Sequence, residues 1–135
     1  MGEPVVKRTG IIHAELSRQI ALLGHTDRIV VGDMGLPLPR DLPVVDLALL
    51  PGTVPFLSVL DALLDEVVVQ RHVVAEESFT GVAGTWFDER ADRLGERTRT
   101  THEELKALVP AAAFAVRTGE ATPYANVVLE CGVPF

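Results

Sequence analysis

The sequence predicts an α/β fold: a three-layer α/β/α arrangement with a mixed, largely parallel central sheet between helices. Three observations predict it. Segments typical of strands and segments typical of helices alternate along most of the chain, which is the order of a parallel sheet with crossover helices. The 135 residues match the size of one domain, and 47% of them are hydrophobic, enough for a packed core. We therefore expect a single domain over residues 1–135.

The first half of the chain supplies two helices and two strands. Apolar residues recur every three or four positions over residues 11–24, which indicates a helix, and Gly24 stands where a left-handed cap ends one. The β-branched residues of 28–33 and of 44–50 predict short strands, with a proline-rich loop between them. From Phe56 to Val67 the apolar positions again share one face of a helix.

The second half continues the alternation. Residues 67–78 read as a strand that ends in acids, and the polar stretch 85–97 as a surface helix. Thr100 or Thr101 caps a further helix from residue 102, because a threonine with an acid three residues later has the capping-box spacing. Strands 112–117 and 126–129 close the chain; the short connection between them leaves no room for a crossover helix and predicts an antiparallel edge.

Composition excludes several classes of function. The net charge of −7, without a basic stripe, argues against nucleic acid as a partner and favours a neutral small molecule. No run approaches the roughly 20 apolar residues that span a membrane, and the first ten residues lack the pattern of a secretory signal. The single Cys131 cannot form an internal disulfide, which fits a buried free thiol in the cytoplasm.

Two polar residues flank the first predicted strand. Asp33 closes it, in the type of position where open α/β sheets bind ligands, and is followed by the stiff loop "DMGLP". His25 stands in the turn before the strand, where an imidazole suits proton transfer near neutral pH. Each has a plain structural alternative: His25 is an exposed turn residue without a role, and Asp33 is a turn or capping residue.

The other motifs limit which ligands and reactions the sequence favours. Tyr124 and Asn126, in a turn stiffened by Pro123, offer hydrogen bonds and an apolar ring face to a small polar molecule. Metal-ligand spacing, a phosphate-binding glycine loop and a hydrolase serine motif are all absent from the sequence, so neither a metal nor a cofactor is expected. His13 and His72 read as structural, His102 begins a helix, and Glu76 and Glu77 read as a solvated pair.

Five blocks of the sequence resemble a known family. They are "GHTD" (24–27), "GDMGLPLP" (32–39), "VPFLSVLDALL" (54–64), "THEELKAL" (101–108) and "RTGEATPYANVVLECGV" (117–133). Together they resemble the RbsD/FucU mutarotase family from about Gly10 to Val133. The "DMGLP" and "TPYAN" segments are similar to the ribose branch of that family, because the fucose branch carries a different loop and lacks the second segment.

The resemblance implies an isomerase that interconverts the pyranose and furanose forms of D-ribose without metal or cofactor. It implies a cytoplasmic homodecamer of two stacked pentamers with pockets at subunit boundaries. His25 corresponds to the family's catalytic histidine. The residues that match its sugar-binding positions are Asp33, His102, Tyr124, Ala125 and Asn126, with Lys106 at a further position near the site.

The chain departs from the family pattern in three places. His13 replaces a common asparagine, "DMG" replaces "DAG", and residues 78–100 match only loosely. The first two leave the expected sugar contacts intact, whereas the third can alter substrate preference or subunit packing. Two alternatives therefore stay open: a mutarotase for another sugar such as L-fucose, and a sugar-binding protein without catalysis.

Overall fold

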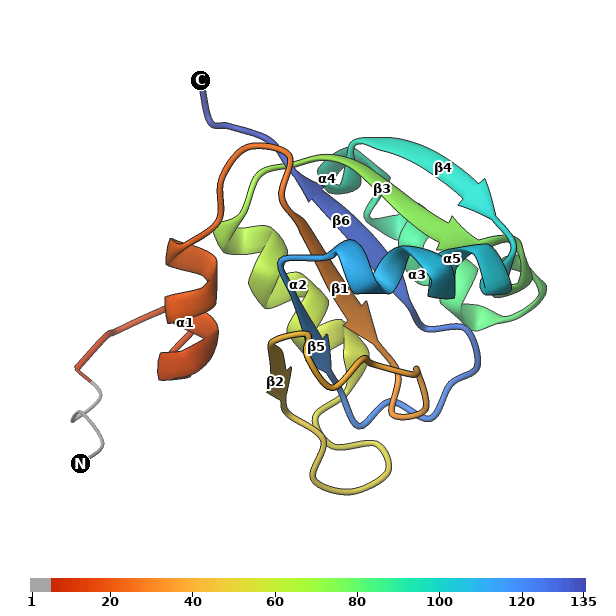
Figure 1. Ribbon diagram of the computed structural model, residues 1–135, viewed down its shortest axis with the longest axis horizontal. Helices are drawn as coiled ribbons and strands as arrows, with labels where there is room; N and C mark the ends of the chain where they lie inside the picture. Colours follow the sequence, from red (N-terminus) through yellow and green to blue (C-terminus); the bar gives the residue numbers. More distant parts are fainter. Residues whose placement is uncertain (1–5) are drawn as a thin grey trace.

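The sheet is mixed and largely parallel, as the sequence predicts. The computed structural model describes residues 6–135 and contains one six-stranded sheet in the order β2-β5-β1-β6-β3-β4 (Figure 1). Every pairing is parallel except those of β6, which runs antiparallel to both of its neighbours. The strands are β1 (Arg28–Gly32), β2 (Val44–Asp46), β3 (Val69–Ala75), β4 (Glu96–Thr100), β5 (Phe114–Arg117) and β6 (Val127–Cys131).

The antiparallel strand lies inside the sheet and not at its edge. β6 sits between β1 and β3, while β2 and β4 form the two edges, so the expected antiparallel edge is wrong. The burial of β6 gives the reason: Val127, Val128 and Leu129 are all buried, with neighbouring side chains on opposite faces. A strand that is apolar on both faces is stable only with a layer on each side.

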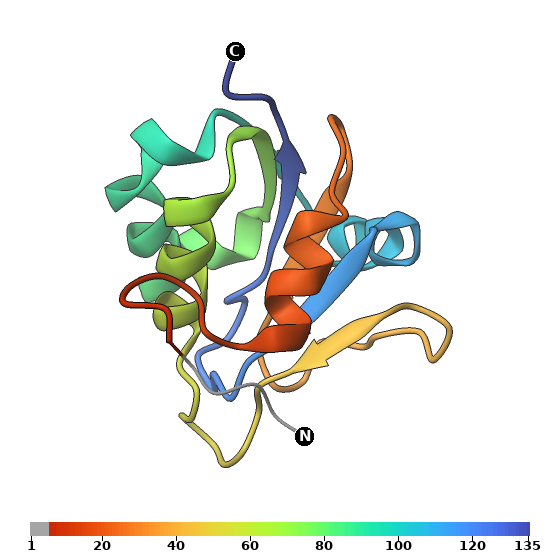
Figure 2. The same ribbon diagram turned by 90° about the vertical axis from the view of Figure 1, so that its left-hand side faces the viewer.

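Helices cover both faces of the sheet, which gives the predicted three layers (Figure 2). One face packs against α1 (Ala14–Ala21), α2 (Phe56–Glu66), α3 (Val82–Glu89) and α4 (Ala91–Leu94) through the larger apolar cluster. The other face packs against α5 (His102–Leu108) through Leu105 and, just beyond the helix, Val109. Two short 3₁₀ helices, Glu76–Thr80 and Val109–Ala111, complete the chain. Within residues 6–135 no helix is long and apolar enough to cross a membrane.

The first helix is shorter than its apolar pattern. His13 is the residue before the helix: its Nδ1 accepts the backbone N–H of Leu16 at 3.1 Å and so caps α1. Gly24 does not adopt a left-handed conformation; Thr26, with φ of 73°, makes the turn instead. The helix stops early because the carboxylate of Asp27 accepts the N–H of Gly24 and holds the following turn.

Strand β4 was not expected from the sequence. The stretch read as one polar helix, residues 85–97, covers most of α3, all of α4 and the first two residues of this parallel edge strand, whose residues are all charged groups or threonines. Arg99 lies over the ring of Phe79, 3.8 Å from its centroid, and pairs with Glu76. Charged residues are common on edge strands because they oppose pairing with other chains, and they conceal the strand pattern.

His72 joins β3 to the elements around it. Its ring is buried; Nδ1 lies 2.9 Å from the carbonyl oxygen of Leu94, and Nε2 lies 3.1 Å from Nε of Arg97. The Arg97 N–H can only donate, so Nε2 accepts and the proton of neutral His72 sits on Nδ1. Burial lowers the pKa of His72, and the nearby charge of Arg97 lowers it further, although the Leu94 carbonyl opposes the shift.

This environment predicts a loss of stability in mild acid. The unfolded chain protonates His72 near pH 6.5 and the folded chain only at lower pH, so folding stability falls as the pH drops below that value. We expect the free energy of unfolding to fall by up to about 1.4 kcal/mol between about pH 7.5 and 5.5 from this residue alone. Urea titrations at one protein concentration measure it. His72→Gln, which cannot titrate, is the control; an equal pH slope in that variant contradicts the assignment.

Candidate active site

The expected site residues lie at two opposite ends of strand β1. Asp33 follows the carboxyl end of β1, and His25 precedes its amino end, in the connection between α1 and β1. That connection lies near the top of Figure 1. Five strand residues at about 3.3 Å each separate the two by roughly 17 Å. The neighbouring strand β6 runs antiparallel to β1, so its two ends meet the same two places. Asn126, just before β6, lies next to Asp33, and Cys131, at its end, lies next to the His25 turn.

Asp33 and Asn126 form a pair of reciprocal hydrogen bonds. The backbone N–H of Asp33 donates to Oδ1 of Asn126 at 2.9 Å, and the Asn126 amide donates to Oδ2 of Asp33 at 3.2 Å. Asn126 is fully buried, so its orientation is fixed by this pairing. Gly32 makes room for it: a Cβ there would lie 3.1 Å from Asn126 Oδ1 and 2.6 Å from a methyl carbon of Leu36.

The carboxyl of Asp33 has a pKa above its ordinary value. Burial raises its pKa, and hydrogen bonds from the N–H of Gly35 and from Asn126 oppose the rise without cancelling it. The nearby charge of His102 also acts to lower the pKa. Such a carboxyl can accept hydrogen bonds from a hydroxyl group, or donate one when protonated.

His102 is held by the start of helix α5. Thr101 caps that helix in a capping box with Glu104, as the sequence predicts, and both carboxylate oxygens of Glu77 accept the His102 N–H at 3.0 and 3.2 Å. Glu77 is therefore not a merely solvated acid. The His102 ring meets the ring of Tyr124 edge to face, with centroids 5.2 Å apart. Its Nδ1 is buried and has no hydrogen-bond partner among residues 6–135.

Turn 118–126 is built to present Tyr124. This residue has φ of 62°, a left-handed conformation, and Ala125 next to it is fully buried. The turn is anchored by Glu120, whose carboxylate accepts the N–H of Phe56 at 3.0 Å and the hydroxyl of Thr122 at 2.8 Å. Burial alone would raise the pKa of Glu120, but these hydrogen bonds outweigh it and keep the pKa below its ordinary value.

His25 stands in a second, separate environment. Its Nε2 lies 3.0 Å from Oε1 of Gln70, and the next residue, Thr26, donates its N–H to the carbonyl of Cys131. The ring lines a hollow of about 300 Å³ together with Glu66 and the chain around Gly132. Burial raises the pKa of the Cys131 thiol to about 11, so Cys131 is the buried, unreactive thiol that the sequence predicts.

Within a single chain, His25 does not face Tyr124 and Asn126, because the turn that carries it lies at the other end of the sheet. The structure does bring Asp33, His102, Tyr124, Ala125 and Asn126 together, and we call these five residues the carboxyl-end group. Lys106 lies one turn along α5 from His102, pairs with Glu103, and lines a hollow with Pro37 and Leu38 of the loop after Asp33.

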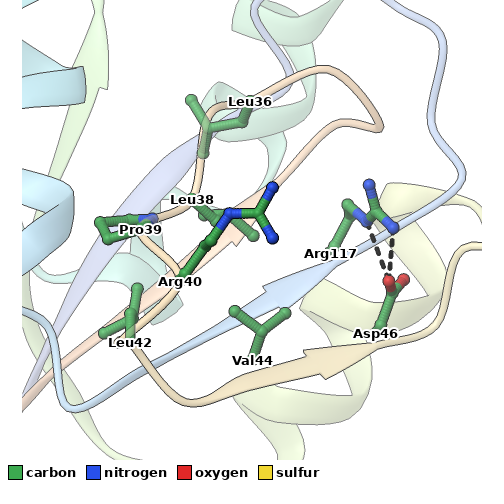
Figure 3. Close-up of a pocket in the computed structure, with 8 residues that line it drawn as sticks. All are labelled: Leu36, Leu38, Pro39, Arg40, Leu42, Val44, Asp46 and Arg117. Atoms are coloured by element: carbon green, nitrogen blue, oxygen red, sulfur yellow. Dashed lines mark hydrogen bonds and ion pairs between the residues drawn. The ribbon is translucent and has the colours of Figure 1, made fainter.

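A further hollow of about 320 Å³ lies beside edge strand β2 (Figure 3). Arg117 and Asp46 form an ion pair at one end of it, linking β5 to β2. None of the expected site residues lines this hollow, and its loop residues, Leu36 and Leu38 among them, follow Asp33 in the chain. Within the described part of the chain, no group of three or more His, Cys, Asp or Glu residues is arranged to hold a metal ion.

Comparison with known proteins decides the family. Residues 6–134 match the model of the RbsD / FucU transport protein family. The chain belongs to the RbsD / FucU family. D-ribose pyranases are among its relatives: that of Cutibacterium acnes is 45% identical over 130 residues, covering 96% of this chain and 100% of that protein. D-ribose pyranase 1 of Rubrobacter xylanophilus is 48% identical over 130 residues, with the same coverage.

Solved structures of RbsD / FucU proteins share the fold. The structure of Bacillus subtilis RbsD complexed with D-ribose matches with a TM-score of 0.87 at 38% identity, over 96% of this chain and 100% of that one. The fucose mutarotase of Streptococcus pneumoniae in complex with L-fucose matches with a TM-score of 0.75 at 20% identity, over 90% and 93%. The second likeness concerns the fold alone.

Proposed function

We propose that this chain is a D-ribose pyranase, an isomerase that interconverts the pyranose and furanose forms of D-ribose. The observation that carries the proposal is the 45% identity to a D-ribose pyranase over 96% of this chain. The carboxyl-end group supports it, because it gathers a carboxyl, an imidazole, a phenol and an amide in one place. Such groups match the several hydroxyls of a pentose.

The reaction needs only proton transfers. Opening the pyranose removes the proton of the anomeric hydroxyl, breaks the bond from C1 to the ring oxygen, and puts a proton on that oxygen. A different hydroxyl then attacks the carbonyl carbon and closes the five-membered ring. General acid–base groups are sufficient for both steps, and one positioned group contributes roughly 10²–10⁴-fold.

Each expected site residue takes one role in this proposal. His25 donates the proton to the ring oxygen. Asp33 accepts a hydrogen bond from a sugar hydroxyl, supported by its position beside the buried Asn126. His102 and Tyr124 bind the remaining hydroxyls from the side of helix α5, and Ala125 lets the chain turn close to the sugar. Asn126 fixes Asp33 and contributes its own amide.

Two copies of the chain are needed to build this site. His25 and Asp33 lie about 17 Å apart along β1, further than a pentose can bridge. We therefore propose that His25 of one subunit faces the carboxyl-end group of another, with the pocket at their boundary. The arrangement proposed is the family's decamer of two stacked pentamers, and the compartment proposed is the cytoplasm.

Saturation-transfer NMR on ribose tests the function. We expect that catalytic amounts of protein accelerate exchange between the pyranose and furanose signals above the rate in buffer. L-fucose in the same assay is the control for substrate, and faster exchange of fucose than of ribose would favour the other branch of the family. Ribose binding without faster exchange would leave a sugar-binding protein and overturn the enzymatic proposal. Sedimentation of the same sample measures the subunit count.

A further inference from the structure

A β-bulge places Gln70 beside His25. The register of β3 against β6 shifts between Val69, which pairs with Cys131, and Arg71, which pairs with Glu130. Gln70 is the extra residue between them. Bulges redirect a side chain and recur next to active sites. Here the redirected amide lies between two groups, with Oε1 3.0 Å from Nε2 of His25 and Nε2 2.6 Å from Oε2 of Glu130.

The chemistry of Glu130 fixes the direction of both hydrogen bonds. An ionised carboxylate only accepts, so the end of the Gln70 amide that faces Glu130 must be its NH₂ group. The end that faces His25 is then the amide oxygen, which also only accepts. The proton between Gln70 and His25 therefore belongs to Nε2 of His25.

Two arginines keep Glu130 ionised. Arg71 and Arg28 lie 3.0 and 3.4 Å from its two carboxylate oxygens, one on each side, and its side chain is only 13% exposed. The hydrogen bond from Gln70, followed by the charges of these arginines, lowers the pKa of Glu130 despite its partial burial. Across the pH range where an enzyme works, this carboxylate has no proton to give, so the orientation of Gln70 does not reverse.

We propose that Glu130, acting through Gln70, holds neutral His25 in the tautomer with its proton on Nε2, so that Nδ1 is the atom that exchanges protons with the sugar. Gln70 and Glu130 are positioning residues, since neither needs to touch substrate. The inference rests on the catalytic role proposed for His25 and names the working atom of that residue.

Every proton that His25 exchanges with the sugar is then given or taken by its Nδ1. In opening, the imidazolium of His25 gives its Nδ1 proton to the ring oxygen as the bond to C1 breaks, while the anomeric hydroxyl proton passes to water. In closure, the hydroxyl on C4 attacks C1 and gives its proton to Nδ1, and water returns a proton to the carbonyl oxygen. Nε2 keeps its proton throughout, bonded to Gln70.

Other charged groups surround the His25 turn. Glu66 of helix α2 lines the same hollow, and Asp27 is two residues along the turn, where it accepts the N–H of Gly24. Arg71 lies on β3 beside Gln70, and Cys131 of β6 keeps its proton because its thiol is buried. Among residues 6–135, the hydrogen-bond partner of the His25 ring is Gln70 and none of these groups.

The tautomer can be read without any activity. In ¹⁵N-labelled protein above about pH 8, where an ordinary imidazole is neutral, long-range ¹H–¹⁵N correlation distinguishes a protonated ring nitrogen from a bare one. The spectrum of His25→Ala identifies the His25 signals among the four histidines. We expect a protonated Nε2 and a bare Nδ1 in the unmodified protein. A protonated Nδ1, or a mixture of tautomers, overturns the inference even if the protein is an active pyranase.

Substitutions of Gln70 and Glu130 test the role of these two residues in catalysis. We expect Gln70→Ala to mix the tautomers and to lower kcat on ribose about 10-fold, with KM nearly unchanged. The double variant Q70E/E130Q keeps an acceptor for Nε2 and a donor for the new carboxylate, so it restores the Nε2 tautomer and most of kcat. Because a carboxylate next to His25 favours the imidazolium, the alkaline limb of its pH–rate profile, where His25 loses the proton that it donates, moves to higher pH.

These outcomes separate the inference from the proposed function. Failure of His25→Ala to slow exchange would remove the catalytic role of His25, whatever the tautomer. Unchanged tautomer and kcat in Gln70→Ala would overturn the positioning role while leaving the pyranase intact. A Q70E/E130Q variant that folds, as circular dichroism shows, but has neither the Nε2 tautomer nor restored kcat contradicts the proposed chain of hydrogen bonds.

Discussion

His25→Ala is expected to lower the rate of pyranose–furanose exchange of ribose by about 10²–10⁴-fold, the contribution of one positioned acid–base group. Removing the imidazole leaves the carboxyl-end group intact, so ribose still binds. The side chain is exposed in the single chain, and within residues 6–135 its ring is hydrogen-bonded to Gln70 alone, so the fold of each subunit persists. Saturation-transfer NMR measures exchange, and circular dichroism checks the fold.

A second exposed histidine supplies the matched control. His13→Asn keeps a side chain that caps α1, because asparagine is a good N-cap residue, and it removes an imidazole that is not among the expected site residues. We expect its exchange rate to equal that of the unmodified protein. If His25→Ala is as fast as His13→Asn, then His25 has no catalytic role.

Asn126→Asp is expected to destabilise the protein by about 3–5 kcal/mol near pH 7.5, the usual cost of an uncompensated buried charge. The new carboxylate still accepts the N–H of Asp33, but its other oxygen faces Asp33 Oδ2 where the amide now donates at 3.2 Å. Two carboxylates in contact raise the pKa of one of them. The stability lost in this variant therefore returns as the pH falls and one proton is shared.

The reversed pair distinguishes charge from packing. In the double variant D33N/N126D, an amide at position 33 can donate to a carboxylate at position 126, so one carboxylate again meets one amide. We expect this variant to recover most of the stability that Asn126→Asp loses at pH 7.5, and urea unfolding at that pH measures it. Equal instability of the single and double variants would show that shape and not charge governs this position.

The sequence predicted those parts of the fold that have an apolar pattern. The helix from Phe56, the strand over 28–33 and the cap at Thr101 are confirmed, because burial and capping are local in sequence. Strand β4 was missed since its alternation is between arginine and threonine, and only pairing with β3 makes it a strand. The place of β6 was also missed: the spacing of two strands does not tell which third strand lies between them.

The residues of the candidate site likewise fall into those that the sequence predicted and those that it did not. Asp33 was found because a strand end is a local signal, and the turn around Tyr124 because its residues are unusual. Gln70, Glu77 and Glu120 carry no local signal, since each acts on a residue more than twenty positions away. A bulge in β3 or a carboxylate beneath a helix start becomes visible only when the elements are placed in space.

The separation of His25 from Asp33 along β1 has a consequence for genetics. In the proposed assembly each pocket takes its imidazole from one polypeptide and its carboxyl from a neighbour. A chain that lacks only the imidazole and a chain that lacks only the carboxyl are each inactive alone. Co-expressed in one cell, they form mixed rings in which some pockets receive both intact halves, so two defective alleles complement each other.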